Sequence, residues 1–291
     1  MKYTSLNEHL LNTYGQKLYK LSLNAGLSCP NRDGTVGKNG CIFCSAQGSG
    51  DFAPDVSYTI GQQIELAKIK VQRKAKCDKF IAYFQSFTNT YGPIPYLEKI
   101  FMEAIQHPDI EILSIATRPD CLSPPILELL GRLKQIKPVW VELGLQTIHE
   151  ETAQFINRGY PLYVYDKAVK DLKKLGIEVI VHVILGLPHE TSKQILETVD
   201  YVCNSGIQGI KLQLLHVLKN TKLAEYYEEG LFATLTMEEY LDLLEMCIKK
   251  IPSSVVIHRL TGDGPKSLLI APLWSQNKKL VINAINQRFS S

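Results

Sequence analysis

Residues 177–190 read IEVIVHVILGLPHE, and this stretch decides the fold class. Its central part is almost continuously hydrophobic, which is typical of a strand in a parallel sheet that helices cover. Parallel neighbours are joined by crossover connections, usually helices, so the flanking sequence should alternate between strands and helices.

The rest of the chain shows this alternation. Further short apolar runs lie at residues 18–23, 80–84, 110–116, 139–143, 207–215 and 255–257. Between the runs, apolar side chains recur at helical spacing, and Thr236 with Glu239 forms a capping-box pattern at one helix start. So many β/α units with right-handed crossovers predict an α/β protein with a mostly parallel sheet that forms a full or partial barrel.

Composition agrees with one ordinary globular domain. The 291 residues are 45% hydrophobic and 21% charged, which excludes disorder, collagen-like repeats and coiled coil. A net charge of +3 permits a polyanionic partner without indicating a dedicated nucleic-acid-binding domain. No linker divides the chain, so we expect a single domain over residues 1–291. The sequence has no membrane-spanning or targeting signal, which predicts a cytoplasmic protein with reduced thiols.

A long irregular segment at residues 27–57 is the first candidate for function, because long loops in compact domains usually carry function. It contains SCPNRDGTVGKNGCIFCS, in which Cys29, Cys41 and Cys44 cluster on a glycine-rich loop. Soft thiolates on such a loop suit a compact polynuclear metal centre. Two alternatives remain open on spacing alone: loose surface thiols, and a structural zinc site with a distant histidine.

With these residues in place, the chain resembles the radical S-adenosylmethionine (SAM) enzymes. That superfamily usually has CxxxCxxC, whereas this chain has eleven residues between its first two cysteines, as in the Elp3-like branch. The resemblance is closest to the small bacterial MnmL-type tRNA-modification proteins. It is carried by the motifs CPNRDG, CIFC, FQSFTNTYGP, ATRPDC, ELGLQT, INRGY and GLPHET.

The resemblance implies a partial (β/α) barrel of the radical SAM type, with a mostly parallel sheet that is open on one side. It also implies a 4Fe–4S cluster held by Cys29, Cys41 and Cys44, with one iron left open for SAM. It further implies reduction by a flavodoxin or ferredoxin, cleavage of SAM to a 5′-deoxyadenosyl radical, and no membrane partner. The implied substrate is a tRNA wobble uridine, whose carboxymethylaminomethyl side chain would become aminomethyl.

The resemblance also places SAM at the carboxyl ends of the strands, where α/β barrels build their sites. The end of the second strand would recognise the amino group, the fourth strand the ribose, the following helix end the carboxylate, and the fifth strand the adenine. The residues implied in this way are Gln85, Ser86, Glu142, Gln146, Arg158, Ile184, Gly186 and Leu187. A polar strand end, and a surface ion pair for Glu142 or Arg158, are the plainer interpretations of the same residues.

The last strand, VVIHRLTGD at residues 255–263, begins a substrate-side extension from about residue 252. His258, Arg259 and Asp263 are the catalytic candidates there, at the expected mouth of the barrel. Arg259 suits a substrate carboxylate or phosphate, and His258 or Asp263 suits proton transfer. A solvent-exposed turn explains the same residues equally well.

Two other functions remain open at this point. A radical SAM enzyme acting on a small metabolite, like the HemN-type coproporphyrinogen oxidases, fits the modest charge. A non-catalytic, zinc-stabilised RNA-binding protein fits the cysteine loop alone. The basic run at residues 68–79 is either a solvated face or a contact for phosphates.

Overall fold

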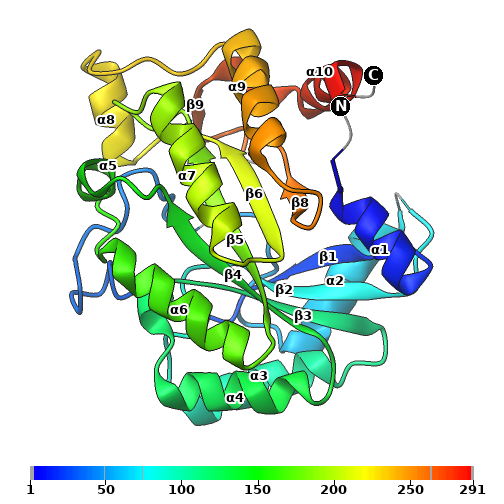
Figure 1. Ribbon diagram of the computed structural model, residues 1–291. Coiled ribbons are helices and arrows are strands. Elements are labelled where there is room, and N and C mark those ends of the chain that lie inside the picture. The colour runs from blue at the N-terminus through cyan, green and yellow to red at the C-terminus, as the bar shows by residue number, and fades with distance from the viewer. Residues whose placement is uncertain (1–2, 49, 74, 263, 290–291) are drawn as a thin grey trace.

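A computed structural model describes residues 3–48, 50–73, 75–262 and 264–289. Its main element is a seven-stranded sheet in the order β1-β2-β3-β4-β5-β6-β8, in which every pairing is parallel. The sheet curls into a half-barrel, which confirms the predicted partial barrel (Figure 1). Its strands are β1 Tyr19–Leu23, β2 Phe80–Phe84, β3 Ile110–Thr117, β4 Val139–Gln146, β5 Glu178–Leu185, β6 Gly209–Leu214 and β8 Val256–Arg259.

Helices cover the convex side of this sheet (Figure 1). Those that pack on it are α2 Ile60–Gln72, α3 Ile94–Ile105, α4 Pro124–Lys134, α6 Leu162–Lys174 and α7 Ser192–Asn204. Helix α9, Met237–Lys250, packs against α7 and begins with the predicted capping box of Thr236 and Glu239. Gly176, with φ 62°, follows the end of α6 in the left-handed conformation that glycine adopts readily.

The alternation of side chains along each strand divides the protein into two apolar regions. On the convex face, Val179, Val181 and Val183 of β5 join the large core beneath the helices. On the concave face, the same strand contributes to the space that the curved sheet encloses, here called the lumen. An apolar cluster closes the lumen at the amino ends of the strands and consists of Leu10, Leu18, Ile81, Ile112, Trp140 and Ile180.

The sheet is not closed, because the described residues show no pairing between its end strands β1 and β8. Helix α1, Leu6–Tyr14, lies at this opening and buries Leu10 in the apolar cluster. Ser5, just before α1, forms a parallel bridge with Ile257 of β8. None of the helices in the described part of the chain has the length and hydrophobicity needed to cross a bilayer.

The segment after β6 contains more regular structure than expected. Strands β7, Val217–Leu218, and β9, Leu269–Ala271, form an antiparallel pair. The other elements absent from the prediction are α1, α5 Glu150–Phe155, α8 Lys222–Glu228, α10 Lys278–Phe289 and the 3₁₀ turns Pro119–Cys121 and Leu273–Gln276. As predicted, the described residues between β1 and α2 form neither helix nor strand.

Candidate active site

A cavity lies at the carboxyl ends of the strands, between the cysteine loop and the lumen. It holds about 990 Å³ of space free of protein atoms, part of it open to solvent. Ligand sites of α/β barrels are built at this end, from loops that follow the strands. The predicted site residues that line the cavity are Cys29, Cys41, Cys44, Gln85, Glu142, Gln146, Arg158, Ile184 and Arg259.

The cysteine loop is held over the cavity by contacts with distant segments. Asn31 donates to the carbonyl of Asn157 at 2.6 Å, and its amide nitrogen lies 3.9 Å from the sulfur of Cys41. Arg32 donates to the carbonyls of Cys44 at 2.9 Å and Ser45 at 2.6 Å. The side chains of Asn31 and Arg32 donate hydrogen bonds to backbone carbonyls that have no partner in a helix or strand. These bonds hold the loop in one shape without secondary structure.

All seven cysteines are free thiols, which agrees with the expectation that the chain has no disulfide framework. Burial raises the pKa of Cys41 to about 12, with a further increase from nearby Cys44. Burial likewise raises the pKa of Cys44. The two thiols therefore carry their protons at neutral pH, and a metal that binds them must displace those protons.

The sulfurs of Cys29, Cys41 and Cys44 do not all lie within 4.8 Å of one another. Among the described residues, one group of possible ligands has all its atoms within 4.8 Å of one another, and it is Glu65, His107 and Asp109. The three cysteines are absent from that group, so their sulfurs are spread more widely than one ion requires. A four-iron cluster is larger than one ion, and thiolates are its usual ligands.

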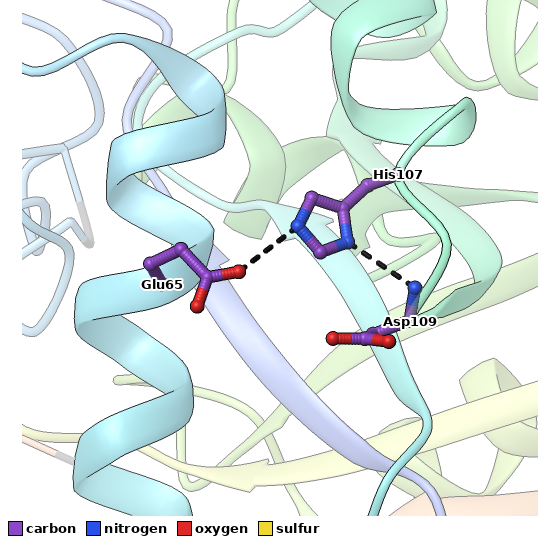
Figure 2. A group of neighbouring side chains, drawn as sticks. All are labelled: Glu65, His107 and Asp109. Atoms are coloured by element: carbon purple, nitrogen blue, oxygen red, sulfur yellow. Dashed lines mark hydrogen bonds and ion pairs between the residues drawn. The ribbon is translucent and has the colours of Figure 1, made fainter.

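The Glu65, His107 and Asp109 group lies away from the cavity, between α2 and the start of β3 (Figure 2). His107 lies 3.0 Å from Glu65, and Lys68 places its ammonium 2.8 Å from Glu65 and 2.5 Å from Asp109. The ammonium thus occupies the position between the carboxylates. The basic run at residues 68–79 is therefore partly neutralised, since Lys79 also pairs with Glu111 at 2.9 Å. Lys74 of this run lies outside the described residues.

Charged side chains cross the lumen below the cavity. Glu142 is fully buried and forms ion pairs with Lys20 and Lys211. It also lies 2.7 Å from the Nε2 atom of His182 and accepts from Ser114 at 2.7 Å. We call the following residues the lumen layer: Lys20, Tyr83, Ser114, Glu142, His182 and Lys211.

Electrostatics in the lumen layer follow from burial and from these pairs. Burial alone would raise the pKa of Glu142, but the ammonium groups of Lys20 and Lys211 outweigh it and hold the pKa well below 4.5. Burial lowers the pKa of Lys211 well below its usual value, although Glu142 opposes this. Burial also lowers the pKa of His182 to about 4, with a further decrease from Lys211. His182 is therefore neutral at pH 7.

Acidification from pH 6.5 to about 4 should destabilise the protein through His182. In this window the unfolded chain binds a proton at that histidine and the folded chain does not, so the free energy of unfolding falls as pH falls. The His182→Gln variant should lack this decrease. Urea unfolding of wild type and variant at several pH values measures it.

Ser114→Ala is the control for this prediction, because it removes a neighbouring hydrogen bond to Glu142 without removing a titrating group. Its unfolding profile should keep the slope of wild type. Parallel profiles for wild type and His182→Gln would show that the histidine is not held neutral in the folded protein.

Of the residues predicted to bind the ribose and amino group of SAM, Gln146 and Gln85 line the cavity and Ser86 does not. Gln146 lines the cavity with φ 73°, and its buried Oε1 has no hydrogen-bond partner. An orphaned buried acceptor indicates a missing donor, and a hydroxyl group would supply one. Gln85 reaches the cavity and accepts from Ser22 at 3.0 Å. Ser86 is buried beneath Gly50 of the cysteine loop and does not line the cavity.

Arg158 is buried, and the carboxylate that pairs with it, Glu150, is 46% exposed. Its guanidinium donates to the carbonyls of Tyr160 at 3.0 Å and Thr147 at 2.6 Å, and pairs with Glu150 at 3.2 Å. These contacts fix the turn that connects β4 to α6. Arg158 still lines the cavity, so its contact with the SAM carboxylate stays a prediction.

Three residues at the end of strand β5 are predicted to contact the adenine of SAM, and one of them lies at the cavity. Ile184 lines the cavity, whereas Gly186 and Leu187 do not. Gly186 has φ 86°, and a Cβ atom there would lie 3.0 Å from the side chain of Leu235. Leu187 packs in the same apolar cluster as Ile184 and Leu215. Gly186 therefore allows a close contact with Leu235 and not with a molecule in the cavity.

The predicted position of His258 at the mouth of the barrel is wrong. Its ring lies 5.1 Å from that of Trp140, and a Cβ atom on Gly209 would lie 2.6 Å from its Nε2. Trp140 and Gly209 lie at the amino ends of β4 and β6, so His258 faces the closed end of the lumen. The cause is a register shift that pairs Lys211 with Arg259.

Arg259 and Asp263 complete the catalytic candidates. Arg259 lines the cavity as predicted. Asp263 lies outside the described residues. Sequence reasoning missed Lys20 and Lys211, although a lysine in each of the apolar strand texts YKLSL and GIKLQL was a usable signal. It also missed Arg118, which lines the cavity. The guanidinium of Arg118 donates two hydrogen bonds, of 2.8 and 2.9 Å, to the carboxylate of Asp120.

Comparison with known proteins gives two family matches that together span most of the chain. The model of the radical SAM superfamily matches residues 33–202, and that of the radical SAM C-terminal domain matches residues 207–291. YtqA of Bacillus subtilis is 43% identical over 290 residues, covering 100% of this chain and 90% of that protein. YhcC of Escherichia coli is 36% identical, covering 92% and 86%.

More distant matches extend the comparison. The tRNA uridine(34) acetyltransferase of Methanocaldococcus jannaschii is 28% identical over 173 residues, which are 57% of this chain and 30% of that protein. The solved structure of Elp3 from Methanocaldococcus infernus superimposes with a TM-score of 0.70 at 17% identity. The superposition covers 93% of this chain and 63% of the Elp3 chain, and it supports the fold.

Proposed function

This chain belongs to the radical SAM superfamily, and on that premise we propose that it converts the carboxymethylaminomethyl side chain of a tRNA wobble uridine to the aminomethyl form. Proteins of this superfamily use a 4Fe–4S cluster and SAM, and the chain is a radical SAM enzyme. Membership therefore removes the alternative of a non-catalytic, zinc-stabilised RNA-binding protein.

One observation carries the proposal: Cys29, Cys41 and Cys44 share a cavity with the polar residues of the strand ends. The cysteines would hold the cluster. When bound, the cluster and SAM would supply the one-electron chemistry that removes a hydrogen atom from the carboxymethyl carbon. Loss of one further electron to the oxidised cluster would give an imine, which water would hydrolyse to the aminomethyl group and glyoxylate. The chain itself holds the loop over the cavity, offers the unpartnered Gln146 oxygen to a cofactor hydroxyl, and excludes water from the lumen.

Two features support a tRNA substrate. A matched relative is named a tRNA uridine(34) acetyltransferase, and position 34 is the wobble nucleotide. In addition, the cavity adjoins a hollow that shares Phe43, Gln213 and Arg259 with it. That hollow in turn adjoins another, lined by Phe52 and Lys266 among others.

Phe52 gives the outer hollow the chemistry of an RNA contact. Its side chain is 53% exposed, and exposed aromatic rings serve as stacking platforms for unpaired bases. Lys266 beside it is exposed and suits a phosphate. We further propose that the enzyme works in the cytoplasm with a flavodoxin or ferredoxin as its reductant.

The proposal predicts a change in the wobble nucleoside of purified tRNA. tRNA from a strain that lacks this protein is incubated anaerobically with the reconstituted enzyme, SAM and a reductant, and its nucleosides are separated by mass spectrometry. The carboxymethylaminomethyl nucleoside should decrease as the aminomethyl nucleoside increases by the same amount. The control is the same incubation without SAM.

The rate of SAM cleavage supplies an independent measure, because this tRNA should accelerate it. SAM cleavage that continues while the tRNA nucleosides stay unchanged would show that the wobble uridine is not the substrate.

A further inference from the structure

Two lysines share the single carboxylate of the lumen layer. Lys20 and Lys211 both pair with Glu142, and His182 beside them is neutral. Both ammonium groups also lie 4.6 Å from the centre of the Tyr83 ring, whose face attracts cations without carrying a charge. Burial disfavours the charged form of Lys211, and a second anion beside it would stabilise that form.

Part of this layer forms the floor of the cavity, and Lys20 and Lys211 contact that part through Glu142. Tyr83, Glu142 and His182 line the cavity directly. Lys211 is 3% exposed and lies opposite Arg259, which also lines the cavity, in the register of β6 and β8. The lysine side chain of Lys20 is 19% exposed. An anionic group that reaches the floor would therefore meet cations from β1, β6 and β8 together.

We propose that the lumen layer is a carboxylate subsite, in which Lys20 and Lys211 bind the anionic end of the substrate side chain and orient it below the cluster. This inference rests on the proposed function, because the carboxymethylaminomethyl group ends in a carboxylate. Two other anions come near: the carboxylate of SAM, which is predicted to bind Arg158, and a phosphate of the tRNA backbone. The phosphate is attached to the ribose, so it cannot enter as deeply as the end of a base substituent.

Lys20 and Lys211 can attract the carboxylate of a substrate, which the negatively charged Glu142 cannot do. With the substrate absent, Glu142 holds both lysines in place and limits their repulsion. With the carboxylate bound, each lysine gains a second anionic partner. Lys20 and Lys211 are thus positioning and specificity residues, and they distinguish the substrate from its product, which has lost the carboxylate.

The test compares two tRNAs that differ only at the wobble nucleoside, carboxymethylaminomethyl in one and aminomethyl in the other. Equilibrium binding is measured with the reconstituted enzyme and SAM but without a reductant, so that no turnover occurs. Wild type should bind the carboxymethylaminomethyl tRNA about tenfold or more tightly, the magnitude typical of a hydrogen bond to a charged group. Lys211→Met and Lys20→Met should each lose most of this preference and bind the aminomethyl tRNA as wild type does.

Two further measurements distinguish a misfolded variant from a folded variant that no longer recognises the substrate carboxylate. Each variant leaves Glu142 with one lysine partner, and iron content together with near-ultraviolet circular dichroism reports the fold. Lys20→Met is the safer variant, because its partly exposed side chain fills less of the lumen. Lys170→Met on the exposed face of α6 is the matched control and should keep the full preference.

Three results would overturn the inference, and they also separate it from the proposed function. If wild type converts the tRNA and both variants keep the wild-type preference, the lumen layer does not bind the carboxylate. If wild type converts the tRNA but shows no preference, the same conclusion follows. If wild type neither prefers nor converts the carboxymethylaminomethyl tRNA, both the subsite and the proposed function are wrong.

Discussion

Replacing Cys41 by alanine is expected to abolish the iron–sulfur cluster and all cleavage of SAM. The three loop cysteines supply every thiolate that lines the cavity, so a lost sulfur leaves one iron without a protein ligand. Cys29→Ala and Cys44→Ala should give the same result. Iron and sulfide analysis after anaerobic reconstitution measures the cluster, and chromatography of 5′-deoxyadenosine measures the cleavage.

Cys203→Ala is the matched control. Cys203 lies on α7, packed against the main core, and burial raises its pKa to about 12. Its replacement should leave iron content and SAM cleavage unchanged. A full complement of iron in Cys41→Ala would contradict the assignment of the loop as the cluster site.

Glu142→Ala is expected to destabilise the protein by about 3–5 kcal/mol, the cost of removing one partner from a buried ion pair. The substitution leaves Lys20 and Lys211 facing each other in the lumen with no carboxylate between them. Urea unfolding of the metal-free protein at pH 7 measures the loss. Because Glu142 is also the predicted partner of the SAM ribose, SAM titration of the folded variant tests that role separately.

Glu225→Ala provides the comparison for an exposed ion pair. Glu225 and its partner Lys222 are 59% and 48% exposed, and such pairs contribute about 0–1 kcal/mol. Its unfolding curve should nearly match that of wild type. An equally small effect in Glu142→Ala would mean that water screens the lumen layer, which would also weaken the case for a carboxylate subsite.

Much of the fold is predictable because hydrophobic periodicity is local. The apolar run of β5 and the capping box at Thr236 are written in consecutive residues, and both appear in the structure as expected. Strands β7 and β9 escaped prediction because they are two and three residues long, too short to show a period. The shape of the cysteine loop depends on contacts such as Asn31 with Asn157, 126 positions apart.

The sequence predicts those parts of the site whose residues are close together along the chain. The cysteines are close in sequence, so their common role could be expected before any fold was known. Lys20, Glu142 and Lys211 are far apart in the chain and share a layer only because of the register of five successive strand pairings. His258 was misplaced because a register shift between β6 and β8 aligns Arg259 and not His258 with Lys211, and no local sequence pattern indicates such a shift.

The bridge between Ser5 and Ile257 bears on how the protein behaves at high concentration. An end strand without a cover presents free N–H and C=O groups, to which strands of other molecules add. Here Thr4 accepts from the N–H of Ile257 at 2.9 Å, and the segment leading into α1 lies along β8. Shortening the chain up to Tyr14 would expose this edge and open the apolar end of the lumen to water. The amino-terminal segment thus protects the half-barrel against edge-to-edge aggregation.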